Sequence, residues 1–423
     1  MQESQSLFIK NIAQIVTRPG SSAVHGRDAM RHIGVVEGPA AVIVKEGIIT
    51  FVGSMEEAVR QDTAGCKEYD AQGCTLLPGF VDSHTHLVFG GYREEEFQWR
   101  LAGDSYMSIM QRGGGIANTM QATRNTSAQD LALAAQTHLQ AMLSMGVTTV
   151  EAKSGYGMEL NTELKQLQVV RELQQTQPIE LVSTFMGAHD TPPEYKGNPT
   201  AFIEHLVQDM LPRVAQEGLA EFCDIFTEEG VFDHAQTRRL LVAAKELGFK
   251  VKMHADEIVP FGGAELAAEL GCFSADHLLQ ISDIGIEALA HSGTVGTLLP
   301  CTAFSLKAPY APARKMIDAG CAVAVASDLN PGSCFSNSVP LMFALATIYM
   351  GMTVEEAITA LTLNGAAAID RAHLIGSIEV GKQADFALLR FPSYRFLSYH
   401  FGVNLVCATI KRGIVYRNEI VKQ

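Results

Sequence analysis

Two histidines lie two positions apart at the end of an apolar run. The run begins with Leu76 and Leu77 and ends with His84 and His86. On a β-strand, the side chains of residues i and i+2 point to the same side, so both imidazoles can reach one point. Because neutral imidazole is a common ligand of first-row metals, this spacing indicates a metal site. Taken alone, the pair fits two hydrogen-bonded histidines at a strand end equally well.

Other side chains that bind metals or transfer protons end later strand-like runs. His189, His254 and His277 each stand at the end of one run, and Asp328 stands at the end of the last. Where strands run parallel in a barrel, their C-terminal ends meet at one face, which would bring five histidines and a carboxylate together. Imidazole and carboxylate groups gathered there predict a metal centre that activates water for hydrolysis.

The elements that must position these side chains alternate between strand and helix. Amphipathic helical patterns separate most of the strand-like runs, for example at 131–144, 163–174 and 236–247. Eight β units joined by helical crossovers predict an α/β fold, a (β/α)8 TIM-type barrel. A doubly wound open sheet is the alternative, although no G-x-G-x-x-G motif follows a first strand. The eight runs are 75–86, 146–153, 179–189, 222–228, 248–257, 272–278, 293–304 and 321–329.

Both ends of the chain have a different character from the middle. Short strand-like runs separated by polar turns occur at 7–9, 41–44 and 48–52, and again at 384–389 and 406–416. Since the two ends of a chain often meet in one domain, we predict a second, small β-sandwich domain formed from both of them. The predicted boundaries are 1–75 and 376–423 for this domain and 76–375 for the catalytic barrel.

Composition limits the class of protein. Of 423 residues, 47% are hydrophobic and 18% are charged, as in globular proteins. The first residues lack the features of a signal peptide, and no run of about 18 apolar residues predicts a membrane span. Eight cysteines without a C-x-x-C pair predict reduced, mostly buried thiols and a cytoplasmic location. The net charge of −14 argues against nucleic acid as a partner, and an anionic substrate would need a specific local cation.

Longer motifs surround the candidate residues at 89–97, 153–157, 187–189 and 328–333. With these motifs and the histidine pair, the chain resembles the amidohydrolase superfamily and, within it, the imidazolonepropionase family of histidine degradation. The resemblance covers nearly the whole chain. Leu329 departs from the family pattern, in which an aromatic residue is more frequent at this position. The resemblance implies hydrolysis of the ring amide of a small molecule, 4-imidazolone-5-propanoate, to N-formimidoyl-L-glutamate.

The resemblance also implies one metal ion per chain, either Zn²⁺ or Fe. Binuclear members of the superfamily bridge two metals with a lysine at the end of strand four, and the fourth run here, 221–228, has no lysine. Lys153 lies on the second run, where we expect a structural or salt-bridged role. Three imidazoles and one carboxylate suit either metal. The implied ligands are His84, His86, His254 and Asp328.

Three residues match the family's catalytic roles. Asp328 is expected to take the proton of the attacking water, since a bound metal lowers the pKa of that water to about 7. Glu257, three residues beyond His254, is expected to hydrogen-bond to the ring and to transfer a proton at a ring nitrogen. His277 is expected to stabilise the developing oxyanion or to orient the nucleophile. Which of the three is the general base stays open, and a solvated loop carboxylate is the alternative for Glu257.

Substrate binding is expected to depend on Arg93, which can hold the propanoate carboxylate through two hydrogen bonds. Taken alone, Arg93 would fit a surface arginine flanked by the acidic residues 94–96. The resemblance implies further contacts with the arm and ring of the substrate and with the product. These contacts are assigned to Tyr156, His189, Asn330, Gly332 and Ser333, with Glu257.

Two other functions stay open. A deaminase of a nitrogen heterocycle would use the same metal ligands, but its substrate would leave Arg93 without a carboxylate partner. A non-catalytic scaffold or binding protein would have no reason to keep an intact ligand set. Family resemblance suggests a homodimer. The glycine-rich segment 112–116 predicts a flexible loop, and whether it is a lid stays open.

Overall fold

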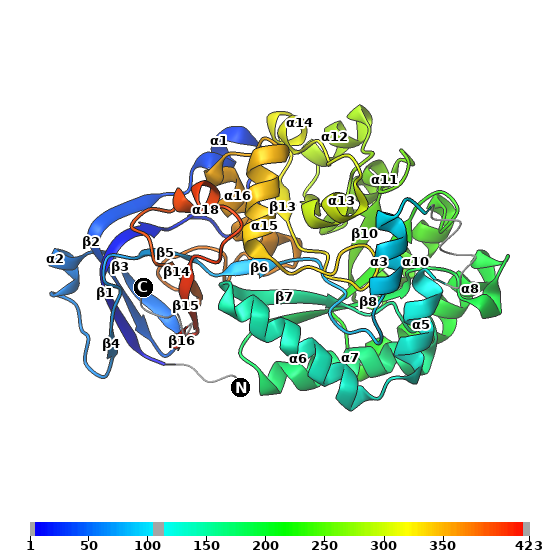
Figure 1. Ribbon diagram of the computed structural model, residues 1–423, viewed down its shortest axis with the longest axis horizontal. Helices are drawn as coiled ribbons and strands as arrows, with labels where there is room; N and C mark the ends of the chain where they lie inside the picture. Colours follow the sequence, from blue (N-terminus) through cyan, green and yellow to red (C-terminus); the bar gives the residue numbers. More distant parts are fainter. Residues whose placement is uncertain (1–4, 105–113, 418–423) are drawn as a thin grey trace.

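A barrel of eight parallel strands, with the helices that link them, forms the larger part of the molecule. The computed structural model describes residues 5–104 and 114–417, and a barrel lies beside a smaller sheet (Figure 1). Each predicted run contains one barrel strand, so the predicted (β/α)8 barrel is confirmed. In chain order, the barrel strands are β6 (Phe80–Asp82), β7 (Val147–Lys153), β8 (Glu180–Ala188), β9 (Phe222–Thr227), β10 (Lys250–Ala255), β11 (Ser274–His277), β12 (Val295–Leu298) and β13 (Val323–Val325).

The barrel closes just beyond the ends of its first and last strands. Thr85 forms a parallel bridge with Leu329. The backbone N–H of His86 donates to the carbonyl of Leu329 at 2.9 Å, and that of Asp328 donates to the carbonyl of His84 at 3.0 Å. These contacts exclude the doubly wound open sheet. The seam of the barrel therefore runs through His84, His86 and Asp328, three of the four residues that we predicted as metal ligands.

Helices link the strands and cover the barrel. The three predicted helical segments coincide with α6 (Ala128–Ser144), α7 (Leu160–Thr176) and α10 (His234–Glu246). Ser127 caps α6 by accepting from the N–H of Asp130, and residues spaced three or four apart, from Leu131 to Met142, face the core. The remaining helices are α1 (Gly26–Arg31), α2 (Met55–Ala58), α3 (Glu94–Leu101), α5 (Ile116–Asn125), α8 (Pro199–His205), α9 (Leu211–Glu217), α11 (Gly263–Glu269), α12 (Asp283–Ala290), α13 (Pro300–Leu306), α14 (Ala313–Asp318), α15 (Val339–Ala344), α16 (Val354–Leu361), α17 (Leu363–Ala368) and α18 (Phe396–Tyr399), with short turns η1 (Pro193–Tyr195), η2 (Leu206–Met210) and η3 (Leu345–Tyr349).

As predicted, both ends of the chain build the second part of the fold; where we expected a β-sandwich, it is one mixed sheet. Hydrogen bonds join its strands into one sheet with the order β16-β15-β14-β5-β1-β2-β3, and β4 pairs with β1. It has its own buried apolar cluster, which includes Ile9, Val42 and Phe386. Its strands are β1 (Leu7–Val16), β2 (Val35–Lys45), β3 (Ile48–Ser54), β4 (Lys67–Asp70), β5 (Thr75–Pro78), β14 (Phe386–Leu389), β15 (Val406–Lys411) and β16 (Ile414–Arg417).

The apolar run 75–86 is divided between the two sheets. Strand β5 pairs with β1 and β14 of the terminal sheet, whereas β6 pairs with β7 of the barrel. Gly79 joins them, and a Cβ atom at this position would lie 2.3 Å from Oγ1 of Thr148. The glycine therefore allows the chain to pass from one sheet to the other against β7. The domain boundaries predicted above stay a prediction.

Three other expectations concern membrane spans, cysteines and the glycine-rich segment. Among the described residues, no helix is long and apolar enough to cross a membrane. All eight cysteines are free thiols, and five of them are buried. Of the predicted loop 112–116, residues 112 and 113 lie outside the described residues, and Ile116 begins α5.

Candidate metal centre and active site

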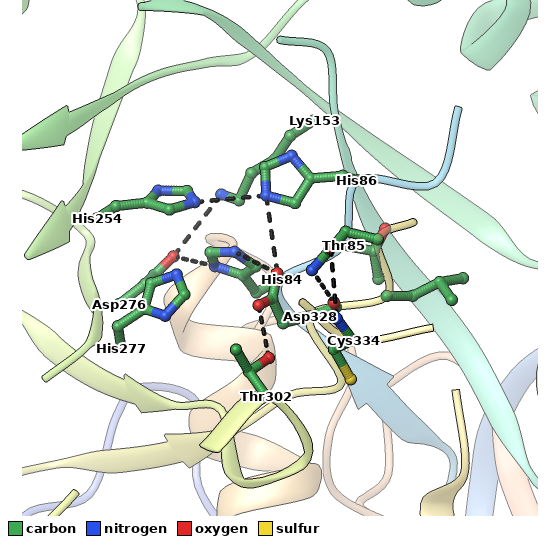
Figure 2. A network of polar contacts seen from close by, with 12 residues as sticks. His84, Thr85, His86, Lys153, His254, Asp276, His277, Thr302, Asp328 and Cys334 are labelled. Atoms are coloured by element: carbon green, nitrogen blue, oxygen red, sulfur yellow. Dashed lines mark hydrogen bonds and ion pairs between the residues drawn. The ribbon is translucent and has the colours of Figure 1, made fainter. Parts of the chain in front are cut away.

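The predicted ligands converge at the C-terminal end of the barrel, where Figure 2 shows their side chains directed toward one another. His84 and His86 follow β6, His254 lies near the end of β10, and Asp328 follows β13. Oδ1 of Asp328 lies 3.4 Å from Nε2 of His84 and 3.7 Å from Nε2 of His86. Nε2 of His254 lies 3.4 Å from Nε2 of His86. Ligand atoms of His84, His86 and His254 lie within 4.8 Å of one another, as do those of His84, His277 and Asp328.

The donor atoms fit a divalent metal ion. Nε2 of His84 and Oδ1 of Asp328 are buried and find no hydrogen-bond partner among the described residues. Buried polar atoms in proteins normally have a bonding partner, so these two atoms are available to bind a metal ion. Burial holds the pKa values of His84 and His86 well below the ordinary value, which keeps the imidazoles neutral and able to bind a metal. Three imidazole nitrogens and a carboxylate are a donor set that suits Zn²⁺ or Fe.

Four residues at or next to the metal site have strained backbone angles. His277, Leu278 and Asp328 have positive φ angles of 79°, 61° and 54°, and Asp256 has a φ of 49°. Such angles are uncommon for residues other than glycine and cost about 1–3 kcal/mol each. The hydroxyl of Thr302 donates to Oδ2 of Asp328 at 2.6 Å and holds its carboxylate in this geometry. Burial raises the pKa of Asp328 to about 6.

Behind the histidines lies a fully buried cluster of charged side chains. Nδ1 of His84 is 2.6 Å from Oδ2 of Asp276, and Nδ1 of His254 is 3.1 Å from Oδ2 of Asp224. Lys153 forms an ion pair with Asp224 at 2.7 Å, which confirms the predicted salt-bridged role. Burial lowers the pKa of Lys153, but the carboxylates of Asp224, Glu151 and Asp276 outweigh this effect and raise it above its ordinary value.

Glu257 and His277 form a second group beside the ligands. Oε2 of Glu257 lies 3.5 Å from Nδ1 of His277, and the glutamate side chain is only 15% exposed. The solvated-loop alternative for Glu257 is therefore wrong. Both oxygens of the buried Glu228 accept hydrogen bonds from the backbone of residues 257–259, which fixes the turn that carries Glu257. Burial, with repulsion from Asp328 and Glu228, raises the pKa of Glu257 to about 8.

Tyr156 and His189 lie against the metal ligand His86. The rings of His86 and His189 are stacked with centroids 4.7 Å apart, and Tyr156 lies 5.6 Å from His86 and 5.1 Å from His189. The carboxylate of Glu163 accepts hydrogen bonds from three backbone N–H groups of residues 155–158 and so fixes the turn that carries Tyr156. The structure therefore brings both predicted substrate residues to the edge of the metal site.

Arg93 is not a surface residue. Its Nε and Nη2 donate to Oε2 of Glu96 at 2.9 and 2.8 Å, and its side chain is 16% exposed. A Cβ atom at Gly332 would lie 2.0 Å from Nη1 of Arg93, so the guanidinium lies directly against this glycine. Both residues line an apolar cavity of about 490 Å³, together with Cys301, the neighbour of Thr302. Arg93 thus lies against the turn that follows Asp328, in the wall of the cavity.

Asn330 organises the turn that follows Asp328. Its Oδ1 accepts from the backbone N–H groups of Gly332 and Ser333 at 2.9 and 2.8 Å, and its Nδ2 donates to the carbonyl of Asp328 at 2.8 Å. Nδ2 also donates to Oγ of Ser333 at 2.9 Å. These bonds set the shape of the turn. The substrate contacts predicted for Asn330, Gly332 and Ser333 stay predictions.

Sequence reasoning missed the residues that support the ligands. Lys252 could have been recognised from its position two residues before His254 on the same face of β10, and Glu151 from the same relation to Lys153. Asp224 lies in the run 221–228, where we looked only for a metal-bridging lysine. No signal in the chain points to Thr302 or Asp276 as partners of Asp328 and His84, because those contacts join distant segments.

Comparison with known proteins agrees with this geometry. The sequence profile of the amidohydrolase family matches residues 75–413. The chain is 72% identical to the imidazolonepropionase of Porphyromonas gingivalis (strain W83), over 98% of this chain and 99% of that one. It is 59% identical to the imidazolonepropionase of Parabacteroides distasonis, with the same coverage. A crystal structure of an adenosine deaminase from Xanthomonas campestris with bound zinc has a TM-score of 0.72 and 18% identity, covering 100% of this chain and 96% of that one, and is similar in fold.

Proposed function

The chain belongs to the amidohydrolase family and, within it, to the imidazolonepropionases, and from this premise we propose how its residues hydrolyse 4-imidazolone-5-propanoate. The reaction opens the ring amide C–N bond by addition of water and gives N-formimidoyl-L-glutamate. The observation that carries the proposal is the buried group of His84, His86, His254 and Asp328, whose donor atoms converge in a chain 72% identical to a curated imidazolonepropionase.

We propose that this group binds one Zn²⁺ or Fe ion per chain. When bound, the ion supplies a Lewis acid that activates water at neutral pH. Side chains from the first, fifth and eighth strands of the barrel would hold it, and Asp328 would be the one carboxylate among the four ligands. Asp328 also accepts the proton of the attacking water, because its carboxylate lies among the ligand atoms and is held by Thr302.

Glu257 carries the proton transfer at the ring nitrogen in this proposal. Its carboxyl group is buried, and its backbone is fixed by Glu228, so it has a defined position beside His277. Burial, the largest cause of its raised pKa, favours the protonated form of Glu257, which can release its proton to the leaving nitrogen. The imidazole of His277 is neutral, because burial holds its pKa well below the ordinary value, and it can donate a hydrogen bond to the developing oxyanion.

Arg93 binds the propanoate carboxylate in this proposal. Glu96 fixes its guanidinium from one side through Nε and Nη2, which leaves the Nη1 and Nη2 edge for a second carboxylate. Tyr156 and His189 contact the ring and the arm from the side of His86, and the turn of Asn330, Gly332 and Ser333 closes the opposite side. Hydrogen bonds to several parts of the substrate align the ring carbonyl for attack.

One experiment tests the proposed function directly. Metal-loaded protein is mixed with freshly made imidazolonepropanoate, and the loss of ultraviolet absorbance is followed together with formation of N-formimidoylglutamate. We expect turnover by the wild-type protein and none by His84→Ala. Deamination of a nucleobase at a rate comparable to that of imidazolonepropanoate hydrolysis would contradict the proposal and favour the deaminase alternative.

We further propose a cytoplasmic location, supported by eight cysteines that are free thiols. The homodimer suggested by family resemblance also stays a proposal, which sedimentation equilibrium would test.

A further inference from the structure

Five charged side chains form a buried cluster beneath the metal ligands. They come from four strands of the barrel, β7 and, beyond β8, the adjacent strands β9, β10 and β11, and all are fully buried. Ion pairs join all five side chains into one cluster in the barrel interior. Its members are Glu151, Lys153, Asp224, Lys252 and Asp276.

Each lysine contacts more than one carboxylate in this cluster. Nζ of Lys153 lies 2.7 Å from Asp224, 2.8 Å from Glu151 and 3.6 Å from Asp276. Nζ of Lys252 lies 3.4 Å from Glu151 and 3.6 Å from Asp276, and donates to the carbonyl of Ser83 at 2.8 Å. Because Ser83 precedes the ligand His84, Lys252 ties the cluster to the backbone of the ligand strand as well as to side chains.

Two of the carboxylates touch metal ligands. Oδ2 of Asp276 lies 2.6 Å from Nδ1 of His84, and Oδ2 of Asp224 lies 3.1 Å from Nδ1 of His254 (Figure 2 shows Asp276 between His84 and Lys153). The hydrogen bond to Asp276 places the imidazole proton of His84 on Nδ1, and the negative charge of Asp224 beside Nδ1 of His254 favours the same tautomer there. Nε2 then carries a lone pair and can bind a metal.

We propose that Asp276 and Asp224 are positioning residues for the metal ligands His84 and His254, and that Lys153 and Lys252 hold these two carboxylates in place. The inference rests on the ligand set proposed above. It adds that the tautomer and the orientation of two of the three imidazoles are determined by residues that touch neither metal nor substrate.

Charge supports the same assignment. Two ammonium groups and three carboxylates give the cluster one net negative charge, and Asp328 adds a second beside the ligands. Two negative charges in a buried site balance one divalent cation. The cluster therefore favours a single divalent ion as well as orienting its ligands.

The test measures metal binding rather than turnover. The Zn²⁺ dissociation constants of the wild-type protein, Asp276→Asn and Asp224→Asn are determined by competition with a chromophoric chelator, and the visible spectra of the Co²⁺-loaded proteins are recorded. Asparagine keeps the shape of aspartate but can present N–H to the imidazole, which would move the proton to Nε2. We expect each variant to bind Zn²⁺ about 10–100-fold more weakly, with altered Co²⁺ bands.

Asp385→Asn is the matched control. Asp385 forms a buried ion pair with Lys411 at 2.7 Å, between side chains that are 2% and 3% exposed, in the terminal sheet. Its loss removes a buried ion pair of the same kind without touching a histidine. We expect Asp385→Asn to lose stability but to keep the wild-type Zn²⁺ dissociation constant and Co²⁺ spectrum.

A double variant addresses failure to fold. If Asp276→Asn alone does not fold, it is combined with Lys252→Met. The double variant loses one positive and one negative charge and so keeps the net charge of the cluster. Weak Zn²⁺ binding by the folded double variant supports the proposal. Wild-type Zn²⁺ binding and Co²⁺ spectra in the aspartate variants or in the double variant would overturn it. A wild-type protein that binds neither Zn²⁺ nor Co²⁺ would overturn the ligand set as well.

Discussion

Replacement of Arg93 by alanine should weaken capture of the substrate carboxylate. A hydrogen-bonded contact between charged groups is worth about 1.5–3 kcal/mol, which corresponds to roughly 10- to 150-fold in binding. We expect a loss of binding free energy at the upper end of this range. Glu96 already holds the guanidinium in position through two hydrogen bonds, so Arg93 loses little side-chain entropy when the substrate binds. The loss should appear mainly in KM if the contact is equally strong in the ground state and the transition state.

The assay compares two substrates and three variants. Hydrolysis of imidazolonepropanoate and of an imidazolone without the propanoate arm is followed by ultraviolet absorbance for Arg93→Ala, Arg93→Lys and Glu96→Gln. Arg93→Lys should recover only part of the binding, since an ammonium group cannot form the two-pronged contact. Glu96→Gln keeps the guanidinium and should have the smaller effect. The imidazolone without the propanoate arm should be a poor substrate, and Arg93→Ala should hardly change the rate of its hydrolysis.

Gly332→Ala tests the same contact from the opposite side. The added Cβ would lie 2.0 Å from Nη1 of Arg93, so the guanidinium must move away from its present position. KM for imidazolonepropanoate should therefore rise in this variant while the metal content stays at the wild-type level. If Arg93→Ala slowed hydrolysis of both substrates equally, the reasoning would be refuted. Arg93 would then maintain the structure of the site and would not bind the carboxylate.

Three further predictions concern the metal and Glu257. Elemental analysis should find about one Zn or Fe per chain, and much less in His84→Ala or Asp328→Ala; two equivalents would contradict the single site. Glu257→Gln should lower kcat by roughly 10²–10⁴-fold with metal retained, and near-normal turnover would exclude the proton transfer. In the metal-free protein, the pKa of Glu257 is raised from 4.5 to about 8, so Glu257 destabilises the fold as pH rises from 4.5 to 8. Glu257→Gln should therefore stabilise the metal-free protein little at pH 4.5 and increasingly up to pH 8, by at most about 5 kcal/mol; a difference independent of pH in denaturant unfolding would contradict the burial of an ionisable group.

The barrel and the face that gathers the histidines could be predicted because both follow short rules of spacing, whereas the choice of four ligands came from the family resemblance. Alternating strand and helix patterns fix the fold class, and strands of a barrel present their C-terminal ends on one face. His84 and His86 share a face because they are two residues apart, and Asp328 follows from its position after the last strand. None of these inferences needs a distance between remote segments.

The remaining features depend on contacts between remote segments. The division of the run 75–86 between two sheets depends on pairing of β5 with β14, a strand from the other end of the chain. The pairing of Asp276 with His84 joins residues 192 positions apart. The contact between Gly332 and Arg93 likewise appears only when the turn after β13 is folded against the segment after β6. Local patterns carry no information about such pairs.

The seam of the barrel has a consequence for synthesis of the protein on the ribosome. Asp82 accepts a hydrogen bond from the backbone of Ser327, a contact that spans 245 residues of sequence. The proposed ligands His84 and Asp328, on the two sides of this seam, are only 3.4 Å apart. The nascent chain thus carries two ligand histidines from its first barrel strand long before Asp328 emerges. Until the last strand closes the seam, the histidines stand at an open edge, so a complete metal site can form only late in translation or after it.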